Sequence, residues 1–272
     1  QSLRSDSMTV DEQQNYQRVV HCNVVDGIAT ITLDSQRNRN ALSRQLLADL
    51  HQSLDEAEAS DARAIVLTHR GPAFCAGADL GHMQVMSAAS EEANYTDALA
   101  LAQMLAALDA CSKPLVARVN GDAFGGGVGL IACCDIAVGL ADARFALSEV
   151  RLGLVPATIS PFVIAAIGAR ATRALALTGE RFDGARAQSL GLLHEVAGDL
   201  PQLDATLERV LADLLQGGPQ AQREVKSLVR EVAGAPCDAA LQRSTSHQLA
   251  RLRLSQEARE RMSAFLARRK RL

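Results

Sequence analysis

The sequence has no hydrophobic stretch long enough to cross a membrane, although 48% of its 272 residues are hydrophobic. Its most apolar segments, 115–119 and 163–167, are short and flanked by polar residues or glycine, whereas a spanning helix needs about 20 consecutive apolar residues. Such a composition indicates a soluble chain that can bury a large core. We therefore expect no contact with a membrane.

Signals for export and for cysteine chemistry are missing as well. The residues before Met8 contain no apolar segment, so 1–7 are interpreted as a cloning remnant rather than a signal peptide. The six cysteines show no C-x-x-C spacing, and several lie inside apolar runs. Disulfides and a zinc site are therefore not expected, and a reducing, cytoplasmic location is indicated.

A strong excess of one charge and a metal-ligand pattern are also lacking. The net charge is −3, which argues against nucleic-acid binding by the whole chain. The histidines form no H-E-x-x-H or comparable spacing, so no metal is expected.

Strand and helix signals alternate through the first half of the chain. Two β-prone runs, 19–25 and 28–33, are joined by Asp26-Gly27, which predicts a hairpin. Ser43 is placed as the N-cap of a helix, and later strands are expected at 64–68, 115–120 and 135–138. After Pro156 helices dominate, with candidates at 157–167, 169–177, 184–190, 200–215, 220–232 and 257–269. The pattern predicts an α/β protein with a parallel component and a helical C-terminal third.

Two turns rich in small residues follow predicted strands. The first covers 71–80, and the second contains Gly125, Gly126 and Gly127 at the start of an apolar helical run. The second turn lacks the lysine of a phosphate loop and the glycine at 130 of a dinucleotide-binding loop. What remains are free backbone N–H groups that can face a developing negative charge. One N–H from each turn is enough for an oxyanion hole.

The order of several short motifs is specific. A-G-A-D-L at 76–80, N-G-D-A-F-G-G-G at 120–127, C-D-I-A-V at 134–138 and S-E-V-R-L-G-L-V-P at 148–156 resemble the crotonase (enoyl-CoA hydratase/isomerase) superfamily. R-N-A-L at 39–42 and M-S-A-F-L-A-R-R-K at 262–270 are similar to further segments of that family.

The resemblance implies a crotonase-like spiral of β-β-α units at 8–198 and a helical oligomerisation region at 199–272. It implies a homotrimer or homohexamer and an acyl-CoA substrate, with coenzyme A entering only as part of that substrate and no separate cofactor. The thioester carbonyl is expected between the N–H groups of Ala78 and Gly126, with Glu149 as the acid/base. Residues expected to contact substrate or coenzyme A are Arg39, Ala41, Ala76, Asp79, Leu80, Gly125, Gly129, Phe265 and Arg268.

The sequence departs from the hydratase pattern at one place. Hydratases of the family use two glutamates, and Gly129 stands where the first is expected. A glycine cannot perform acid–base chemistry, so hydration of a 2-enoyl-CoA needs the water to be held otherwise. Candidates are the substrate's own carboxylate, or Glu91, Glu92 or Asp97.

Three activities stay open at this point. A finer resemblance, to bacterial enzymes that hydrate 3-methylglutaconyl-CoA or isohexenylglutaconyl-CoA in leucine or terpene breakdown, favours hydration. A Δ3-Δ2 enoyl-CoA isomerase could work with the single Glu149, and a member without chemistry could serve as an acyl-CoA-binding scaffold.

Overall fold

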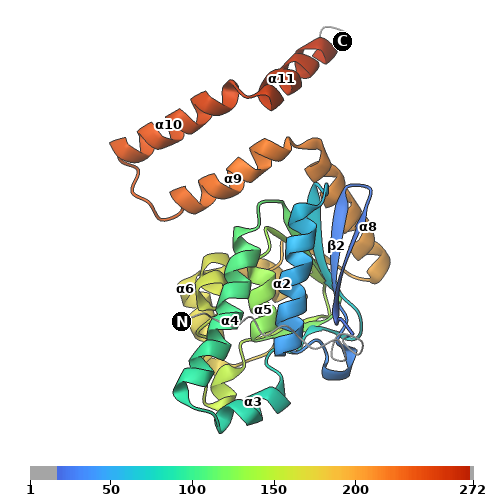
Figure 1. Cartoon of the computed structure of the whole chain (residues 1–272), viewed down its shortest axis with the longest axis vertical. Helices are drawn as coiled ribbons and strands as arrows, with labels where there is room; N and C mark the ends of the chain where they lie inside the picture. The colour runs from blue at the N-terminus through green and yellow to red at the C-terminus, as the bar shows by residue number, and fades with distance from the viewer. Residues whose placement is uncertain (1–16, 270–272) are drawn as a thin grey trace, which may run out of the picture.

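The computed structural model describes residues 17–269, which form a core of two sheets and helices with a helical arm projecting from one end (Figure 1). The larger sheet has the order β1-β2-β3-β5-β7-β10 and the smaller the order β4-β6-β8-β9. The strands are β1 (Val20–Val25), β2 (Ile28–Leu33), β3 (Ala64–His69), β4 (Ala73–Cys75), β5 (Leu115–Val119), β6 (Asp122–Phe124), β7 (Ile136–Leu140), β8 (Arg144–Ala146), β9 (Phe182–Asp183) and β10 (Glu195–Ala197). Apart from the β1–β2 and β8–β9 pairs, all strand pairs are parallel.

Helices connect the strands and make up the whole C-terminal region. They are η1 (Gln36–Asn38), α2 (Arg44–Ala59), α3 (Leu80–Ser87), α4 (Glu91–Ala110), α5 (Gly126–Ala132), η2 (Glu149–Leu152), α6 (Ser160–Thr178), α7 (Gly184–Leu190), α8 (Leu200–Gln216), α9 (Pro219–Val232), α10 (Ala239–Arg253) and α11 (Gln256–Arg269). The α/β class expected from the sequence is confirmed.

Local sequence signals account for the start of the fold. Asp26 and Gly27 both adopt positive φ, 50° and 77°, as a two-residue hairpin turn requires. The hydroxyl of Ser43 accepts a hydrogen bond from the N–H of Leu46 at 3.2 Å and caps α2. The predicted hairpin and the predicted N-cap are both confirmed.

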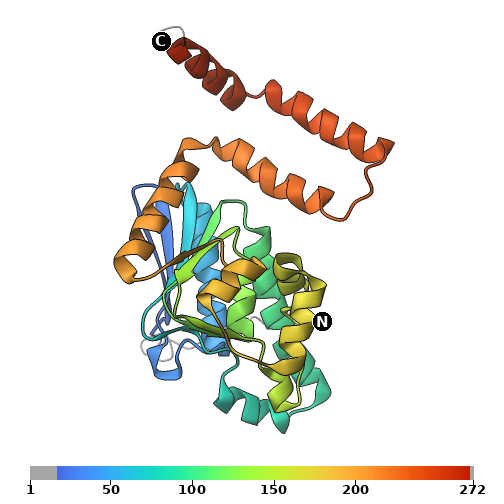
Figure 2. The same cartoon turned by 180° about the vertical axis from the view of Figure 1, so that it is seen from behind.

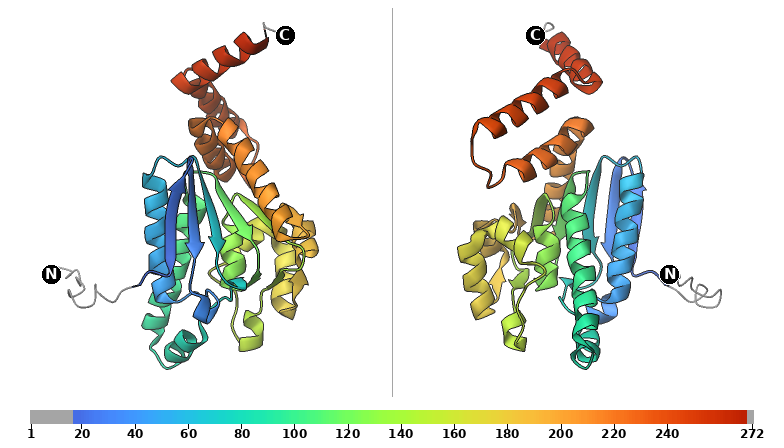
Figure 3. Two further views of the ribbon diagram at one scale, coloured as in Figure 1. Left: turned by 90° about the vertical axis from the view of Figure 1, so that its right-hand side faces the viewer. Right: turned by 60° about the vertical axis from the view of Figure 1, so that its left-hand side comes forward.

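Helices cover both faces of the larger sheet. On one face α2 packs on β1 and β2, and α4 packs against α2 and α5. The alternating residues Ile31 and Leu33 of β2 are fully buried. On the other face lies α8 (Figures 2 and 3), and its Leu203 and Val210 pack on Val116 of β5. The parallel strands in the middle are buried on both faces, so they lack a polar side.

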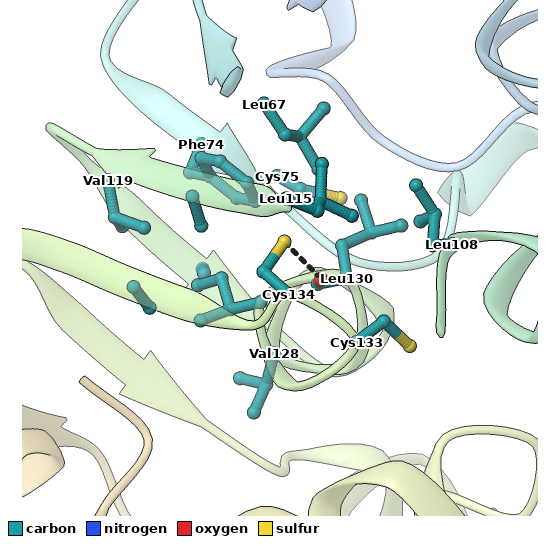
Figure 4. Packing of buried hydrophobic residues seen from close by; sticks show 14 of the residues in the cluster. Leu67, Phe74, Cys75, Leu108, Leu115, Val119, Val128, Leu130, Cys133 and Cys134 are labelled. Carbon is teal, nitrogen blue, oxygen red and sulfur yellow. Dashed lines mark hydrogen bonds between the residues drawn. The ribbon is translucent and has the colours of Figure 1, made fainter. Parts of the chain in front are cut away.

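The buried cysteines belong to this packing. Cys75 and Cys134 lie among aliphatic and aromatic side chains around α5, and the Cys134 thiol donates to the Leu130 carbonyl at 3.3 Å (Figure 4). Burial raises the pKa of Cys75 to about 12, so this thiol stays protonated and behaves as a small hydrophobe.

The arm is tied to the core at its base. Lys226 of α9 donates to Asp135 at 2.7 Å and to the carbonyl of Lys113 at 2.9 Å. Arg230 donates to the carbonyl of Asp109 at 2.8 Å. Beyond these contacts α10 and α11 extend away from the sheets (Figures 1 and 3).

Helix α6 is the described helix long and apolar enough to cross a membrane by length and composition. It is kinked at Gly168 (φ 80°, ψ 155°), where the sequence predicts a break between two helices. Its buried residues are Val163, Ile167, Thr172 and Leu175, and the rest of the helix is partly or fully exposed.

Two helices were not predicted. Helix α3 lies in a segment whose path the sequence did not indicate, and its apolar residues do not gather on one side. Helix α10 is polar on most of its surface, with no residue buried. Both helices lack the regular spacing of apolar residues on which sequence-based helix prediction depends.

Candidate active site

The first small-residue loop connects β4 to α3. Gly77 has φ 89°, and a Cβ on it would lie 2.8 Å from the carbonyl oxygen of Phe124. Only glycine fits there, because that contact would be closer than van der Waals distance. Asp79 caps α3 by accepting from the N–H of His82 at 2.9 Å.

The second loop connects β6 to α5 and packs against the first. A Cβ on Gly127 would lie 2.6 Å from the Cys75 carbonyl oxygen, and one on Gly126 would lie 2.3 Å from Cδ1 of Leu42. Gly125 has φ 49°, and its N–H donates to the carbonyl of Ala146 at 2.9 Å. The glycines thus allow the two main chains to come into direct contact.

The N–H groups of Ala78 and Gly126 lie on these two adjoining loops. Among residues 17–269 no hydrogen bond engages either group. Gly126 is the first residue of α5, so its N–H has no partner within the helix and lies at the positive end of the helix dipole. Each of the two N–H groups is therefore an open hydrogen-bond donor on one of the two loops.

Glu149 lies beside the second loop. Strand β8 pairs with β6, with Ala146 opposite Phe124, and leads within three residues to Glu149 at the start of η2. Its Oε1 is 2.7 Å from the place that a Cβ on Gly125 would occupy. The structure therefore brings the predicted carboxyl to the predicted oxyanion loop.

The environment of Glu149 favours its neutral form. Its Oε2 is buried and has no hydrogen-bond partner in the described part of the chain. Burial raises the pKa of this carboxyl above its ordinary value, because desolvation disfavours the charge. Such a carboxylic acid is suited to deliver a proton.

Apolar side chains lie next to Gly129, where the sequence lacks a glutamate. A Cβ on Gly129 would lie 2.5 Å from Cγ2 of Ile159 and 3.6 Å from Cδ2 of Leu105. The space in that direction is therefore occupied by apolar side chains. The sequence identified Gly129 but not Ile159, because no local signal connects the two residues.

The acidic residues considered as holders of the water, Glu91, Glu92 and Asp97, have other surroundings. Glu91 and Glu92 are exposed in the first turn of α4. Asp97 is hydrogen-bonded to Nε2 of His82 at 2.7 Å and ion-paired with Arg44 at 3.3 Å. Asp97, which belongs to α4, therefore links this helix to His82 of α3 and to Arg44 of α2.

The remaining predicted binding residues divide into two groups. One group lies on or beside the two loops: Arg39, Ala41, Ala76, Asp79, Leu80 and Gly125. Phe265 and Arg268 lie on α11, in the arm, and are exposed. Within one chain the structure does not bring these two residues to the loops (Figure 1).

No cluster of metal-ligating side chains occurs among the described residues.

Comparison with known proteins identifies the family. The family model for enoyl-CoA hydratase/isomerase matches residues 23–271. The chain belongs to the enoyl-CoA hydratase/isomerase family. Its α/β architecture is accordingly the crotonase fold, as the sequence predicted.

Members of this family are similar to the chain over most of its length. Enoyl-CoA hydratase AKT6-1 of Alternaria alternata is 40% identical over 217 residues, covering 78% of this chain and 70% of that protein. The 2,3-dehydroadipyl-CoA hydratase of Escherichia coli is 34% identical over 248 residues, covering 89% and 93%. A crystal structure of an enoyl-CoA hydratase from Shewanella pealeana superposes with a TM-score of 0.88 at 35% identity, covering 96% and 98%.

Proposed function

We propose that this enoyl-CoA hydratase/isomerase family member is a hydro-lyase that adds water across the double bond of a 2-enoyl-CoA thioester. The carrying observation is the pair of unengaged N–H groups at Ala78 and Gly126 with the carboxyl of Glu149 beside them. Named enoyl-CoA hydratases among the relatives support the reaction type.

The proposed reaction uses these three groups together. The thioester oxygen accepts hydrogen bonds from Ala78 and Gly126, which polarises the conjugated double bond. Water adds at the β-carbon, and the electron pair of the double bond moves to the thioester oxygen as an enolate. Glu149, whose pKa is raised by burial, then gives its proton to the α-carbon as the thioester C=O re-forms. The proton that the added water loses passes to the Glu149 carboxylate, which restores the acid. The negative charge develops where the two N–H groups stabilise it most, so they act mainly on the transition state.

The group that holds the water is a separate part of the proposal. Ile159 and Leu105 occupy the direction of a side chain at 129, and Asp97 is engaged by His82 and Arg44. These contacts favour a substrate that carries its own distal carboxylate, such as a branched, methylglutaconyl-like thioester from leucine or terpene breakdown. In that case the substrate supplies the second polar group of the site.

Replacement of Glu149 by Gln tests the assignment of the acid. The amide has nearly the same shape but delivers no comparable proton, so we expect kcat to fall by about a hundredfold or more, in line with general acid catalysis. Binding of a saturated acyl-CoA should change little, because the side chain keeps its volume. A matched control is Glu92→Gln, on the exposed turn of α4. Turnover by Glu149→Gln at the wild-type rate would contradict the role.

A second candidate, Δ3-Δ2 isomerisation, is favoured by the single carboxyl at the site, since one glutamate can move one proton between two carbons. Absorbance at the enoyl-thioester band separates the activities when crotonyl-CoA, a 3-enoyl-CoA and 3-methylglutaconyl-CoA are supplied in turn. Hydration removes the conjugated band and isomerisation creates it. No change with any of the three would indicate an acyl-CoA-binding scaffold and contradict both enzymatic proposals.

Self-association into a homotrimer or homohexamer is part of the same proposal. Helices α9 and α10 enclose a groove of about 720 Å³ lined largely by apolar side chains, among them Val225, Val229 and Leu249. Phe265 and Arg268 of α11 could reach the loops of a neighbouring subunit in such an assembly.

The free cysteines support the predicted cytoplasmic location.

A further inference from the structure

We infer that residues 39–42 act as a positioning segment that orients the Ala78 N–H and sets its distance from the Gly126 N–H, with Asn40 and Leu42 as the positioning residues. The inference rests on the proposed function, since it concerns the same oxyanion hole. Neither residue touches the thioester; both act through the main chain of the loops.

The orientation of the Ala78 N–H follows from planar peptide geometry. The N–H of Ala78 and the carbonyl of Gly77 belong to one peptide unit, and in a trans peptide they point in opposite directions. The N–H of Leu42 donates to that carbonyl at 2.8 Å, and Leu42 pairs with Ala78 as an isolated parallel bridge. The Ala78 N–H therefore points away from Leu42 and is left free for a ligand.

The second donor is held in the same way. The N–H of Gly126 shares its peptide unit with the carbonyl of Gly125, which accepts from the N–H of Gly129 at 3.2 Å. Each donor is thus anchored at the carbonyl end of its own peptide. Hydrogen bonds in series polarise one another, so each anchor also strengthens the N–H as a donor.

Leu42 connects the two donors. Its main chain holds the Gly77–Ala78 peptide, while its Cδ1 lies 2.3 Å from the place that a Cβ on Gly126 would take. One residue therefore contacts both halves of the oxyanion hole. The gap between the two N–H groups depends on the position of Leu42.

Asn40 holds Leu42 in that position. Its side chain is fully buried; Oδ1 accepts from the N–H of Ser35 at 2.7 Å, and Nδ2 donates to the carbonyls of Arg70 at 3.0 Å and Ala73 at 2.9 Å. These bonds join the segment before α2 to the loop that leads into β4.

The main chain at this point is also unusual. Arg39 and Asn40 have φ of 56° and 55°, a left-handed conformation that costs free energy in residues other than glycine. The carbonyl of Arg39 accepts from the N–H of Ala76 at 3.0 Å. The hydrogen bonds of Asn40 and of the Arg39 carbonyl keep these two strained residues in place. Their left-handed conformation sets the direction of the chain, so that Leu42 contacts both loops.

The test uses a variant that removes the side chain without adding strain. Asn40→Gly keeps the left-handed backbone but loses all three side-chain hydrogen bonds, so the Gly77–Ala78 peptide is less firmly held. We expect kcat to fall by about tenfold to a hundredfold, as for misplaced catalytic groups. The Kd of butanoyl-CoA, an unreactive saturated thioester, should stay within about twofold, because preorganisation acts mainly on the transition state.

A spectroscopic readout separates positioning from a general loss of structure. Hydrogen bonds from the two N–H groups lower the stretching frequency of the thioester carbonyl of bound butanoyl-CoA. Infrared difference spectra should show a smaller lowering in Asn40→Gly than in the wild type. Asn23→Gly, at an exposed position of β1, is the matched control and should leave kcat and the frequency unchanged.

Leu42 supplies the second pair of variants in case Asn40→Gly does not fold. Leu42→Ala removes the contact with Gly126 and should reduce both kcat and the carbonyl shift, whereas Leu42→Met keeps the volume and should restore most of each. Wild-type kcat and carbonyl shift in folded Asn40→Gly or Leu42→Ala would overturn the inference. A wild type with neither turnover nor a lowered carbonyl frequency would instead contradict the proposed function.

Discussion

His69 shows what burial does to a single side chain in this fold. It ends β3 and packs edge-on against Phe74, with ring centroids 5.5 Å apart. Neither ring nitrogen has a partner among the described residues, and desolvation lowers the pKa of the imidazole from 6.5 to about 4. The ring is therefore neutral in the folded protein at neutral pH.

This shift predicts an acid-sensitive contribution to stability. The unfolded chain binds a proton at His69 below about pH 6.5 and the folded chain only below about pH 4, so stability falls as the pH drops through that window. The full effect amounts to about 3 kcal/mol. In His69→Gln, the free energy of unfolding measured by urea titration should decline less between pH 7.5 and pH 5 than in the wild type.

The exposed His247 of α10 provides the control, since His247→Gln should keep the wild-type pH dependence. An equal decline in His69→Gln and in the wild type would show that this ring does not carry the effect.

At the scale of elements, the contact between α5 and the start of α6 decides what the site can hold. Gly129 of α5 and Ile159, the N-cap residue of α6, are complementary in volume. A glutamate at 129 would clash with Ile159, and its carboxylate would be a buried charge without a partner. The effect of a substitution at Gly129 therefore depends on which residue is present at 159.

This complementarity predicts coupled substitutions. Gly129→Glu alone should lower the melting temperature strongly, and adding Ile159→Gly should recover part of the loss, with a coupling of about 1–3 kcal/mol. Glycine is required at 159 because a Cβ on residue 129 would lie 2.9 Å from the Cβ of Ile159. Thermal melts of both single variants and the double variant measure the coupling. Additive effects would contradict the volume relationship.

At the scale of the whole molecule, the arm exposes apolar side chains that a monomer would leave in water. Val225, Val229 and Leu249 are 56%, 60% and 52% exposed around the groove between α9 and α10. Apolar surface gathered in this way is characteristic of protein–protein contacts. The arm carries it away from the two sheets (Figures 1 and 2).

The groove therefore predicts assembly through the arm. Val229→Asp combined with Leu249→Asp should shift the particle mass in size-exclusion chromatography with light scattering towards that of a monomer. Buried charges without partners disfavour the contact. Val25→Asp, an exposed apolar residue of β1, should leave the mass unchanged. A wild type that is monomeric at micromolar concentration would contradict the assembly.

Features that depend on neighbouring residues were determined by the sequence. Asp26-Gly27 specifies the hairpin, Ser43 specifies the start of α2, and the glycines at 125–127 specify a helix start with open N–H groups. Each of these signals acts over a few residues, where backbone preference and capping decide the conformation.

Features that depend on residues far apart were decided only by the tertiary structure. The N–H of Leu42 anchors a peptide that lies 35 residues further along the chain, and Ile159 occupies the direction of a side chain at Gly129. Sequence pattern did not indicate α3 and α10. Such contacts arise from packing between distant segments, and packing leaves no periodic or local mark in the sequence.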